Sequence, residues 1–354
     1  MNIAIVVPSL RKTAPVNIAI SIYKDIKSYC NVHATLFYLD KIKDIDNNIN
    51  NIPEAILLNR KNYKLLKNFD IVHTHGLRPD IISFLYAKKK SRVTTLHSMI
   101  IKDLISRYGI KGFFISYMWI FILIFFNKRV SISNSVKKHL IKKKISSTVI
   151  YNGIKFDSFN IKNDKEYLKI DCYINSIKKN KIVVGTISHI EKIKGIEQLI
   201  ELAKLNENIF LIIIGDGTYK YKIEKLVSLY NLENRILFTG HINHNAQYYS
   251  KLFDVYVQPS INEGFGLSVI EAICNKIPVV CSNIEVFTEL FNKQQISFFQ
   301  LNDINSLNNA IQKATTKNTT ELETIANTIK DRFSVSTMSK NYINLYETII
   351  KNER

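Results

Sequence analysis

The sequence predicts an α/β fold in which two doubly wound parallel sheets follow one another along the chain. Short apolar runs alternate with amphipathic segments through residues 1–154, and the same alternation begins again at residue 181. The stretch between them, 155–180, is polar. Buried strands that alternate with helices are typical of parallel sheets, and a chain of 354 residues is long enough for two domains. We therefore expect domains at 1–154 and 181–333 with an interdomain linker at 155–180.

The first half contains apolar runs with the length of buried strands, and helical segments fill the gaps between them. The first helical segment spans 16–29. The expected strands are 3–7, 34–38, 71–73, 93–96, 129–132 and 148–151. Helices between successive strands favour a parallel sheet that is covered on both faces.

The second half repeats this pattern and ends in a helix. Its expected strands are 182–187, 209–214, 236–238, 255–257 and 279–280. The final segment, 337–350, has apolar residues at helical spacing, namely Met338, Tyr342, Leu345 and Ile349. Open parallel sheets bind ligands at the carboxyl ends of their strands, so we expect the working site there, in a cleft between the two domains.

The clearest chemical pattern lies in residues 254–289, where a strand leads into a glycine loop at 259–266 and a helix at 267–274. Gly264 and Gly266 let the backbone approach a ligand closely. The N–H groups and positive dipole of the first helical turn suit a diphosphate. The helix is expected to bury one face, formed by Leu267, Ile270 and Cys274.

Two carboxylates flank this helix start. Glu263 lies in the loop and Glu271 lies one turn into the helix, so both can accept hydrogen bonds from ligand hydroxyls. A simpler interpretation is also open, because Ser268 and Glu271 have the spacing of a capping box that merely closes the helix. The local pattern alone supports the two interpretations about equally.

Composition describes a folded protein, with 46% hydrophobic and 22% charged residues. The first residues form a strand-like run without the basic region and cleavage site of a signal peptide, so we expect a cytoplasmic protein. The cysteines are scattered without C-x-x-C pairs, at Cys30, Cys172, Cys274 and Cys281. We expect them to be reduced core residues, with neither a disulfide nor a structural metal. Asp44 and Asp46 form a D-x-D pattern, which we attribute to chance because no clear buried strand precedes it.

The formal charge of +19 is concentrated in residues 85–150, which carry 14 Lys or Arg against one Asp or Glu. An apolar segment, 113–126, lies inside this block. As a helix it is about 21 Å long, too short to cross a bilayer. It is either a buried core helix or a helix in the membrane interface, where the lysines at 88–90 and 142–144 would attract anionic lipid. We expect no nucleic-acid partner because no recognised nucleic-acid motif accompanies the block.

The stretch with Glu263 and Glu271 resembles the E-x7-E signature of retaining glycosyltransferases of family 4. Further segments resemble that family in the right order, namely 130–135, 149–154, 185–195, 214–217 and 238–240. The resemblance covers nearly the whole chain. It implies the GT-B architecture, in which two Rossmann-like doubly wound parallel-sheet domains face each other across a cleft and a final helix, here 334–354, crosses back to the first domain.

The resemblance also implies roles for individual residues. Glu271 corresponds to the Glu that holds the ribose hydroxyls, and Glu263 to the Glu that holds the donor sugar. Lys194 matches a Lys that contacts the donor diphosphate, whereas His189 stands where the family usually has an Arg. The loop and helix start that would contribute further donor contacts are Gly264, Phe265, Gly266, Leu267 and Ser268.

A histidine of the first domain completes the expected site. His97, which ends the strand at 93–96, matches the family histidine beside the donor sugar, so we take His97 and Glu263 as the catalytic candidates. His73 and His75 end another strand, and we expect them to be mainly architectural. The family's glycine loop after the first strand is replaced here by residues 9–15.

The predicted reaction is the retaining transfer of a hexosyl group from a nucleotide-diphosphate sugar to an acceptor hydroxyl, without a metal ion or another cofactor. The basic and apolar block favours a lipid-linked saccharide acceptor in polysaccharide biosynthesis, and a peripheral position on the inner face of the plasma membrane. Two alternatives remain open: a sugar-nucleotide epimerase with the same fold, and a non-catalytic membrane-surface partner protein. His189 in place of Arg favours the partner protein, whereas the presence of both Glu263 and Glu271 argues against it.

Overall fold

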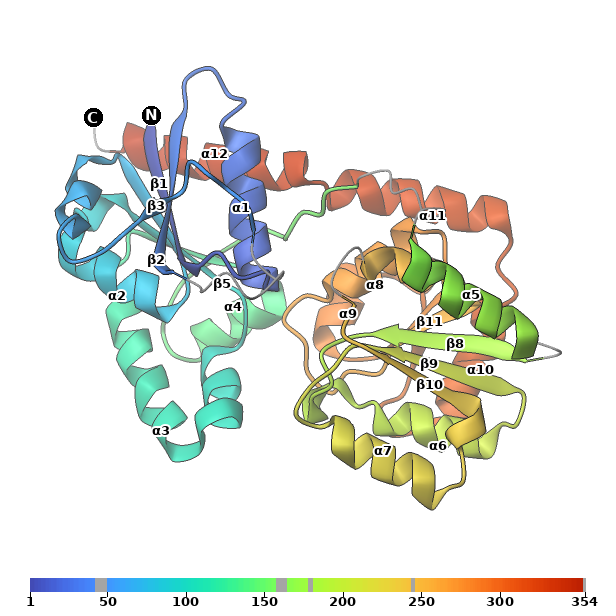
Figure 1. The fold of residues 1–354 in the computed structure, drawn as a ribbon. Coiled ribbons are helices and arrows are strands. Elements are labelled where there is room, and N and C mark those ends of the chain that lie inside the picture. The colour runs from blue at the N-terminus through green and yellow to red at the C-terminus, as the bar shows by residue number, and fades with distance from the viewer. Residues whose placement is uncertain (42–49, 157–163, 178–180, 243–245, 353–354) are drawn as a thin grey trace. The chain divides into compact units, whose positions relative to one another are not determined.

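The computed structural model describes residues 1–41, 50–156, 164–177, 181–242 and 246–352. The chain divides into two compact units. Unit 1 comprises Met1–Lys155 with Phe333–Arg354, and unit 2 comprises Phe156–Arg332. Figure 1 shows helices and parallel strands alternating in each unit. The predicted α/β class is therefore confirmed for both halves of the chain.

Unit 1 is built on a parallel sheet whose described strands follow the order β3-β2-β1-β4-β5-β6-β7. These strands are β1 (Asn2–Ser9), β2 (His33–Asp40), β3 (Ile56–Leu57), β4 (Ile71–His75), β5 (Arg92–Leu96), β6 (Lys128–Ser131) and β7 (Thr148–Val149). Every residue from Ile3 to Val7 is fully buried, because helices cover both faces of the central strand. β3 was not expected, since it is only two residues long and Ile56 is exposed.

The helices of unit 1 are α1 (Ala14–Ile26), α2 (Leu77–Tyr86), α3 (Ile100–Leu123), α4 (Asn134–Ile141) and α12 (Val335–Lys351), with short 3-10 turns η1 (Tyr63–Asn68) and η2 (Lys89–Ser91). The expected final helix is confirmed as α12, which lies beside α1 in unit 1 (Figure 1). Met338, Tyr342 and Ile349 are buried as expected. Leu345 is only half-buried, and Tyr346 takes the buried position instead.

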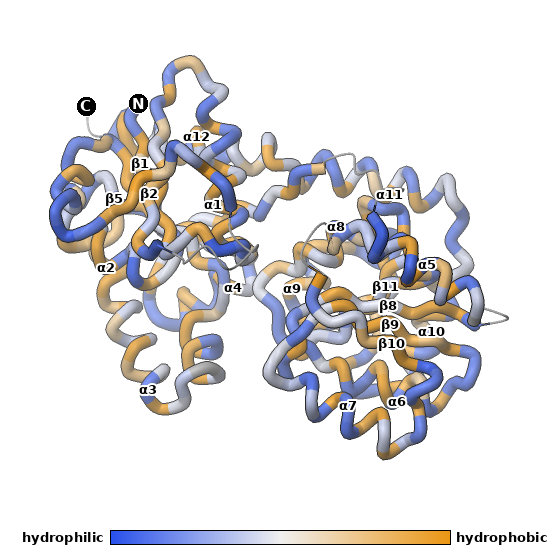
Figure 2. Tube along the Cα trace, in the orientation of Figure 1, coloured by the Kyte–Doolittle hydropathy of each residue, from blue (hydrophilic) through white to orange (hydrophobic). Residues whose placement is uncertain are grey.

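Unit 2 is built on a second parallel sheet, with the described strands in the order β10-β9-β8-β11-β12-β13. They are β8 (Ile182–Ile187), β9 (Ile209–Ile214), β10 (Ile236–Gly240), β11 (Val255–Gln258), β12 (Val279–Ser282) and β13 (Ser297–Phe299). β9 is buried along its whole length. Figure 2 shows β8 and β9 as largely hydrophobic, like β1 in unit 1. β13 was missed because it has only three residues and starts with a serine.

The helices of unit 2 are α5 (Lys165–Ile177), α6 (Glu197–Leu205), α7 (Lys220–Leu229), α8 (Leu267–Cys274), α9 (Glu285–Leu290), α10 (Ile304–Ala314) and α11 (Thr319–Arg332). Its 3-10 turns are η4 (Lys192–Lys194), η5 (Glu233–Arg235) and η6 (Ala246–Leu252). A core cluster between the sheet and these helices includes Leu199, Leu211 and Val257.

The expectation of a linker over residues 155–180 is wrong for α5. This helix belongs to unit 2, where Tyr167 packs edge-on against Tyr249 of η6 with 5.3 Å between ring centroids. The Tyr249 hydroxyl also donates a hydrogen bond to Asp164, just before the helix. The helix was missed because its sequence is mostly polar. α5 is amphipathic and buries only a narrow face, which includes Tyr167 and Ile174.

One further expectation needs correction. Cys281 is buried, but Cys30 and Cys172 are exposed, so the cysteines are not uniformly core residues. For residues 113–126, where two interpretations were open, the structure excludes a helix buried on all sides: Phe114 and Phe121 are more than half exposed, whereas Leu123 and Phe126 are buried. Within the described residues, no helix is both long enough and apolar enough to cross a membrane. Asp44 and Asp46 lie outside the described residues.

Candidate donor site in unit 2 and histidine cluster in unit 1

The centre of the candidate site in unit 2 is an ion pair between Lys194 and Glu263. Lys194 Nζ lies 2.6 Å from Glu263 Oε2, and both side chains are less than one-fifth exposed. The other carboxylate oxygen of Glu263 accepts a hydrogen bond from the N–H of Gly264, 3.2 Å away. Two residues that the sequence predicted from separate motifs, 69 positions apart, are thus in direct contact.

Backbone contacts hold the two loops of this ion pair together. The Ile193 carbonyl accepts a hydrogen bond from the N–H of Ile261, and the Gln198 side chain donates to the Pro259 carbonyl at 2.9 Å. Gly195 has a positive φ of 64°, and a Cβ on it would lie 2.3 Å from the same Pro259 oxygen. Only glycine allows this close approach, so the loop that carries Lys194 is pressed against the loop that carries Glu263.

The glycine loop ends where α8 begins, as the sequence predicted. Gly266 is the N-cap residue, with φ 92°, and no side chain caps the helix. The capping-box interpretation of Ser268 and Glu271 is therefore wrong. The Ser268 hydroxyl instead donates to Gln258 Oε1 at 3.4 Å. The first N–H groups of α8 have no partner within the helix, which makes this end suitable for an anion.

The buried face of α8 differs in part from the expectation. Ile270 is fully buried, but Leu267 and Cys274 are only half-buried. Val269 and Ile273 take their place on the buried face. Leu267 is thus left partly accessible at the start of the helix, in the position expected for a donor contact.

Glu271 is half-buried by exposed area, yet protein surrounds its carboxyl closely enough for burial to raise its pKa to about 7. Among the described residues no hydrogen bond reaches this carboxylate. A carboxylate that lacks protein donors keeps its full acceptor capacity for a ligand. The role that the sequence resemblance implies for Glu271, holding the ribose hydroxyls, stays a prediction.

A buried polar chain under the glycine loop was missed at the sequence level. Tyr256 donates to Gln258 Oε1 at 2.6 Å, and Gln258 donates to the Ser260 hydroxyl at 2.8 Å. The Ser282 hydroxyl donates to the Ser260 carbonyl at 2.6 Å. The available signal was a Gln and a Ser directly after the apolar run of β11. These hydrogen bonds hold the start of the glycine loop in place.

His189 does not join the Lys194 and Glu263 pair. Its side chain is 67% exposed, and its Nε2 lies 3.2 Å from Glu191 Oε1. The backbone on either side of it is held by the neighbouring loop, since the N–H groups of Ser188 and Ile190 donate to Ile214 and Asp216. The Ser188 hydroxyl is buried without a hydrogen-bond partner among the described residues. It is a further candidate contact that sequence reasoning missed.

The carboxyl ends of β4 and β5 in unit 1 carry a cluster of three histidines. His75 Nδ1 lies 2.9 Å from His97 Nε2. His73 contacts the Thr95 hydroxyl through Nε2 and the Tyr346 hydroxyl of α12 through Nδ1. His73 therefore has the architectural role that we expected. His75 instead contacts His97, and its Nε2 is buried without a partner among the described residues.

All three imidazoles are held in the neutral form by their surroundings. Burial lowers the pKa of His97 to about 4 and that of His73 to about 3. Burial, together with the two neighbouring histidines, also lowers the pKa of His75 well below its ordinary value. Nε2 of the neutral His97 already contacts His75, so Nδ1 is the ring nitrogen that can donate or accept a hydrogen bond with a sugar hydroxyl.

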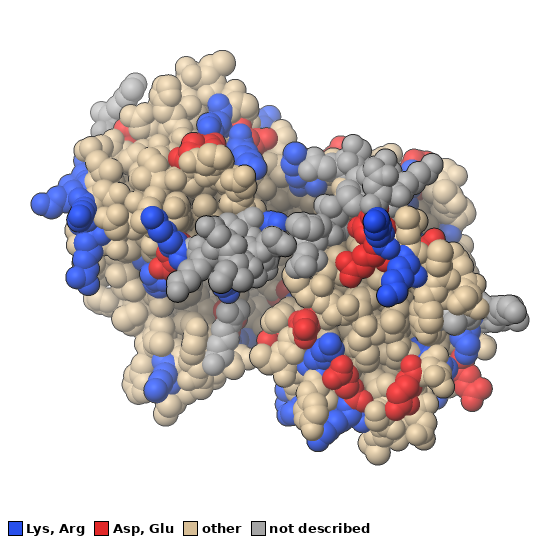
Figure 3. Space-filling model, viewed as in Figure 1, with Lys and Arg blue, Asp and Glu red and all other residues tan. Residues whose placement is uncertain are grey.

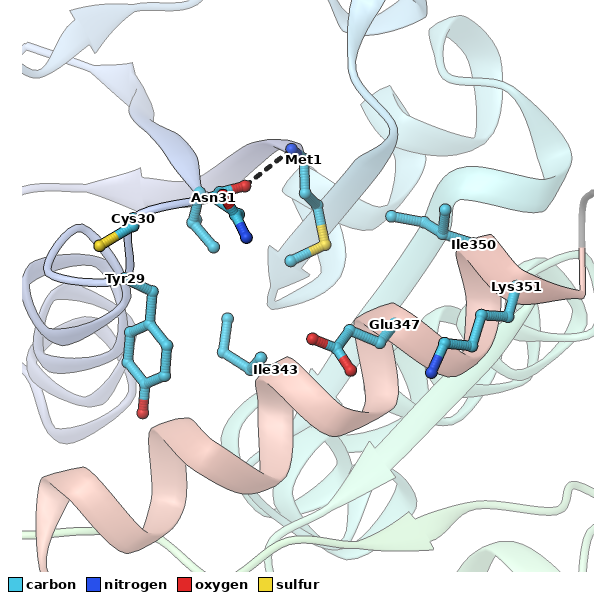
Figure 4. A pocket seen from close by; sticks show the side chains of 9 residues that line it. Met1, Tyr29, Cys30, Asn31, Ile343, Glu347, Ile350 and Lys351 are labelled. Atoms are coloured by element: carbon cyan, nitrogen blue, oxygen red, sulfur yellow. Dashed lines mark hydrogen bonds between the residues drawn. The ribbon is translucent and has the colours of Figure 1, made fainter.

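No group of three or more His, Cys, Asp or Glu side chains that could hold a metal ion occurs in the part of the chain that is described. Unit 1 also has a surface cavity of about 540 Å³ between the N-terminus and α12. Figure 4 shows Glu347 and Lys351 of α12 on one side of it and Tyr29 and Cys30 on the other. None of the predicted site residues lines this cavity.

Comparison with known proteins covers both units. Residues 173–331 match the family described as glycosyl transferases group 1, and residues 35–158 match glycosyltransferase family 4. The chain is 32% identical over 362 residues to the O-antigen biosynthesis glycosyltransferase WclY of Escherichia coli, with 99% of both chains covered. It is 29% identical to a UDP-Gal:alpha-D-GlcNAc-diphosphoundecaprenol alpha-1,3-galactosyltransferase of Escherichia coli, over 72% of this chain and 68% of that enzyme.

Solved structures show the same fold. HepE of Anabaena, in complex with UDP and glucose, superimposes with a TM-score of 0.77 at 17% identity, over 98% of this chain and 100% of HepE. A glycosyltransferase of Rickettsia africae superimposes with a TM-score of 0.73 at 22% identity, over 99% of each chain.

Proposed function

The chain is a GT-B glycosyltransferase of polysaccharide biosynthesis, of the group 1 and family 4 type, and from this premise we propose that it transfers a hexosyl group with retention at the anomeric carbon. The donor is a nucleotide-diphosphate sugar and the acceptor is a saccharide hydroxyl. The observation that carries this proposal is the contact of Lys194 with Glu263 beside the glycine loop that opens α8.

In this proposal unit 2 binds the donor. Glu271 accepts hydrogen bonds from the ribose hydroxyls, because its carboxylate has no donor among the described residues. The diphosphate lies at the N-terminus of α8, where N–H groups of the loop and of Leu267 and Ser268 point outward. HepE, which shares this fold, has been solved with UDP-glucose, and this supports a nucleotide sugar as the donor.

The ion pair supplies the charge that the reaction needs. In the free protein Glu263 neutralises Lys194. When the donor binds, the Lys194 ammonium turns to the diphosphate oxygens, and the Glu263 carboxylate accepts hydrogen bonds from hydroxyls of the sugar. Lys194 then has the diphosphate as its partner, and Glu263 has the sugar hydroxyls. As the bond from the anomeric carbon to the diphosphate breaks, negative charge grows on the leaving oxygen, and preorganised cations and N–H groups stabilise it. We propose that this occurs without a metal ion.

His97 is assigned to the donor sugar in the same proposal. It is neutral at physiological pH because burial lowers its pKa to about 4, so it acts as a hydrogen-bonding group and not as a cation. His189 contributes one hydrogen bond to the diphosphate at most, since its exposed side chain already faces Glu191. Lys194 then carries most of the phosphate neutralisation.

We further propose a lipid-linked saccharide as the acceptor and a peripheral position on the inner face of the plasma membrane. The Escherichia coli relative UDP-Gal:alpha-D-GlcNAc-diphosphoundecaprenol alpha-1,3-galactosyltransferase supports this class of acceptor. The excess of basic residues in 85–150 supports contact with an anionic membrane surface.

A screen of nucleotide sugars tests the proposal. The purified chain is heated with each donor, and its thermal stability and its hydrolysis of the donor are measured, for the wild type and for Glu271→Ala, Lys194→Ala and His189→Ala. We expect one donor to stabilise the wild type, with the effect lost in Glu271→Ala and Lys194→Ala but largely kept in His189→Ala. Glu224→Ala, on the exposed face of α7, is the matched control.

Other results would contradict the proposal. Intact donor affinity and turnover in Lys194→Ala would remove Lys194 from the site. Conversion of the donor to an isomer without any acceptor would favour the epimerase, and tolerance of alanine at both Glu263 and Glu271 would favour a non-catalytic partner protein. Sensitivity of turnover to EDTA would contradict metal independence.

A further inference from the structure

Helix α3 of unit 1 is a hairpin with two arms. Gly109 interrupts the helix with φ 56° and ψ −133°, so a first arm, 100–108, turns into a second arm, 110–123. The arms approach closely, since a Cβ on Gly112 would lie 2.0 Å from the carbonyl oxygen of Leu104. Figure 1 shows this hairpin projecting from unit 1 away from its sheet.

The outer face of the second arm carries a continuous apolar stripe. Ile110 is 77% exposed, Phe114 66% and Phe121 58%. The stripe consists of Ile110, Phe114, Tyr117, Met118 and Phe121 in the arm and Ile124, the residue that caps its end, and all six are exposed. Spacings of three and four place them on one side of the helix. On the face in view in Figure 3, the hairpin shows mainly side chains without charge.

The opposite face of the second arm is anchored to unit 1, so the stripe cannot turn inward. Trp119 donates a hydrogen bond to the buried Asp80 at 2.7 Å. Asp80 also accepts from the hydroxyls of Thr74 and Thr94, on β4 and β5. The one tryptophan of the chain therefore fixes the orientation of the arm.

Basic residues accompany the stripe. Lys143, two residues after the end of α4, donates a hydrogen bond to the Tyr117 hydroxyl at 3.0 Å, and its Nζ lies 5.1 Å from the centre of the Tyr117 ring. Lys111 is exposed in the second arm and Lys102 in the first. A second copy of the chain would bring the same basic block against itself, and the like charges would repel. An apolar face bordered by lysines instead complements an anionic lipid surface.

We infer that the second arm of α3 lies in the interface of an anionic bilayer, with its apolar stripe among the upper acyl chains and Lys102, Lys111 and Lys143 at the headgroups. The arm is about 21 Å long, which suits a helix lying in the membrane plane. The inference deepens the proposed function by naming the segment that meets the membrane. It rests on that function, which requires a lipid-linked acceptor.

The hairpin also connects the membrane with the histidine cluster. The first arm begins at Ile100, three residues after His97. Ser98, the next residue after His97, donates to Asp103 in the first turn of that arm at 3.2 Å. Docking of the hairpin therefore holds the end of β5 near the surface in which a lipid-linked acceptor is embedded.

Vesicle flotation of the full chain tests the inference directly. Phosphatidylcholine vesicles with and without phosphatidylglycerol are floated with the wild type, with the double variant Phe114→Ser and Phe121→Ser, and with Leu229→Ser. Leu229, on α7, is 71% exposed and serves as the matched apolar control. We expect the wild type to float with anionic vesicles only, the control to behave like the wild type, and the double variant to lose about tenfold or more in partitioning.

A second measurement separates docking from catalysis. Thermal unfolding shows whether the double variant is folded, which we expect because both side chains are exposed. Its transfer to a short-chain acceptor in solution should equal that of the wild type, whereas transfer to the acceptor in vesicles should fall about as much as partitioning. Wild-type flotation with neither vesicle, or equal flotation of the double variant, would overturn the inference even if transfer in solution succeeds. If the wild type forms dimers in solution and the double variant does not, the stripe is instead a contact surface for a second copy of the chain.

Discussion

His75 Nδ1 lies 2.9 Å from His97 Nε2 at the carboxyl ends of two neighbouring strands of unit 1. One of these nitrogens must carry the shared hydrogen, so the tautomer of His75 decides the tautomer of His97. His75 is buried and has a fixed position in β4, whereas His97 is the residue proposed to contact the donor sugar. His75 is thus placed to fix the orientation of the His97 ring.

Replacement of His75 should affect turnover more than donor binding. We expect His75→Ala to lower kcat by roughly 10- to 100-fold with little change in the donor KM, because His97 loses its orientation. His75→Asn, whose amide can replace Nδ1, should recover part of the loss. Steady-state kinetics decide this, and equal losses of kcat in the Ala and Asn variants would contradict the positioning role.

Donor affinity should weaken as the pH falls through about 7. Burial raises the pKa of Glu271 to about 7, so this carboxylate is protonated at a higher pH than carboxylates at the surface. The neutral acid accepts hydrogen bonds less well than the carboxylate does. Affinity should therefore be greatest above this pKa. Titration calorimetry from about pH 6 to pH 8 measures the change. Glu271→Gln should show weaker binding with a flatter pH profile, and an unchanged profile in that variant would assign the titration to another group.

Gly195, the glycine of the Lys194 loop, should tolerate alanine poorly. Gly195→Ala introduces a Cβ against the Pro259 carbonyl, which separates the two loops and the ion pair. Gly240→Ala is a matched control, because Gly240 has a similar φ of 74° but nothing lies within 4 Å of its added Cβ. We expect Gly195→Ala to lower the free energy of unfolding by about 2 kcal/mol more than the control, measured by urea denaturation. Equal losses would mean that backbone strain alone decides the cost.

Asp80 should contribute strongly to the stability of unit 1. Burial raises its pKa to about 7, although three donors oppose this shift. Asp80→Ala leaves the Trp119 indole and the Thr94 hydroxyl without their acceptor, whereas the Thr74 hydroxyl keeps the Val93 carbonyl. We expect a loss of roughly 2 to 4 kcal/mol in the free energy of unfolding. Urea denaturation followed by far-UV circular dichroism measures it, because this signal is also available in a variant that lacks the one tryptophan. Trp119→Phe, which keeps the two threonine partners, should cost clearly less.

Much of the candidate site in unit 2 could be predicted from local pattern. The glycine loop, the start of α8 and the two glutamates follow from residue types and spacing within a few turns. The contact between Lys194 and Glu263 could only be inferred through a family resemblance, because it joins two loops far apart in sequence. The support from Gln258 and Ser260 was missed, since buried polar residues give no periodic signal.

The sequence by itself determined the two α/β halves, their described strands other than the short β3 and β13, and the final helix, because buried strands and amphipathic helices leave regular apolar patterns. It could not decide which face of residues 113–126 is buried, since that segment is apolar almost all round and has no polar side to mark the solvent. The tertiary structure decided this through the hydrogen bond of Trp119 to Asp80 and the close contact at Gly112. It likewise decided the pairing of His75 with His97, because the parallel register of β4 and β5, which aligns His75 with Thr95, brings the two strand ends together.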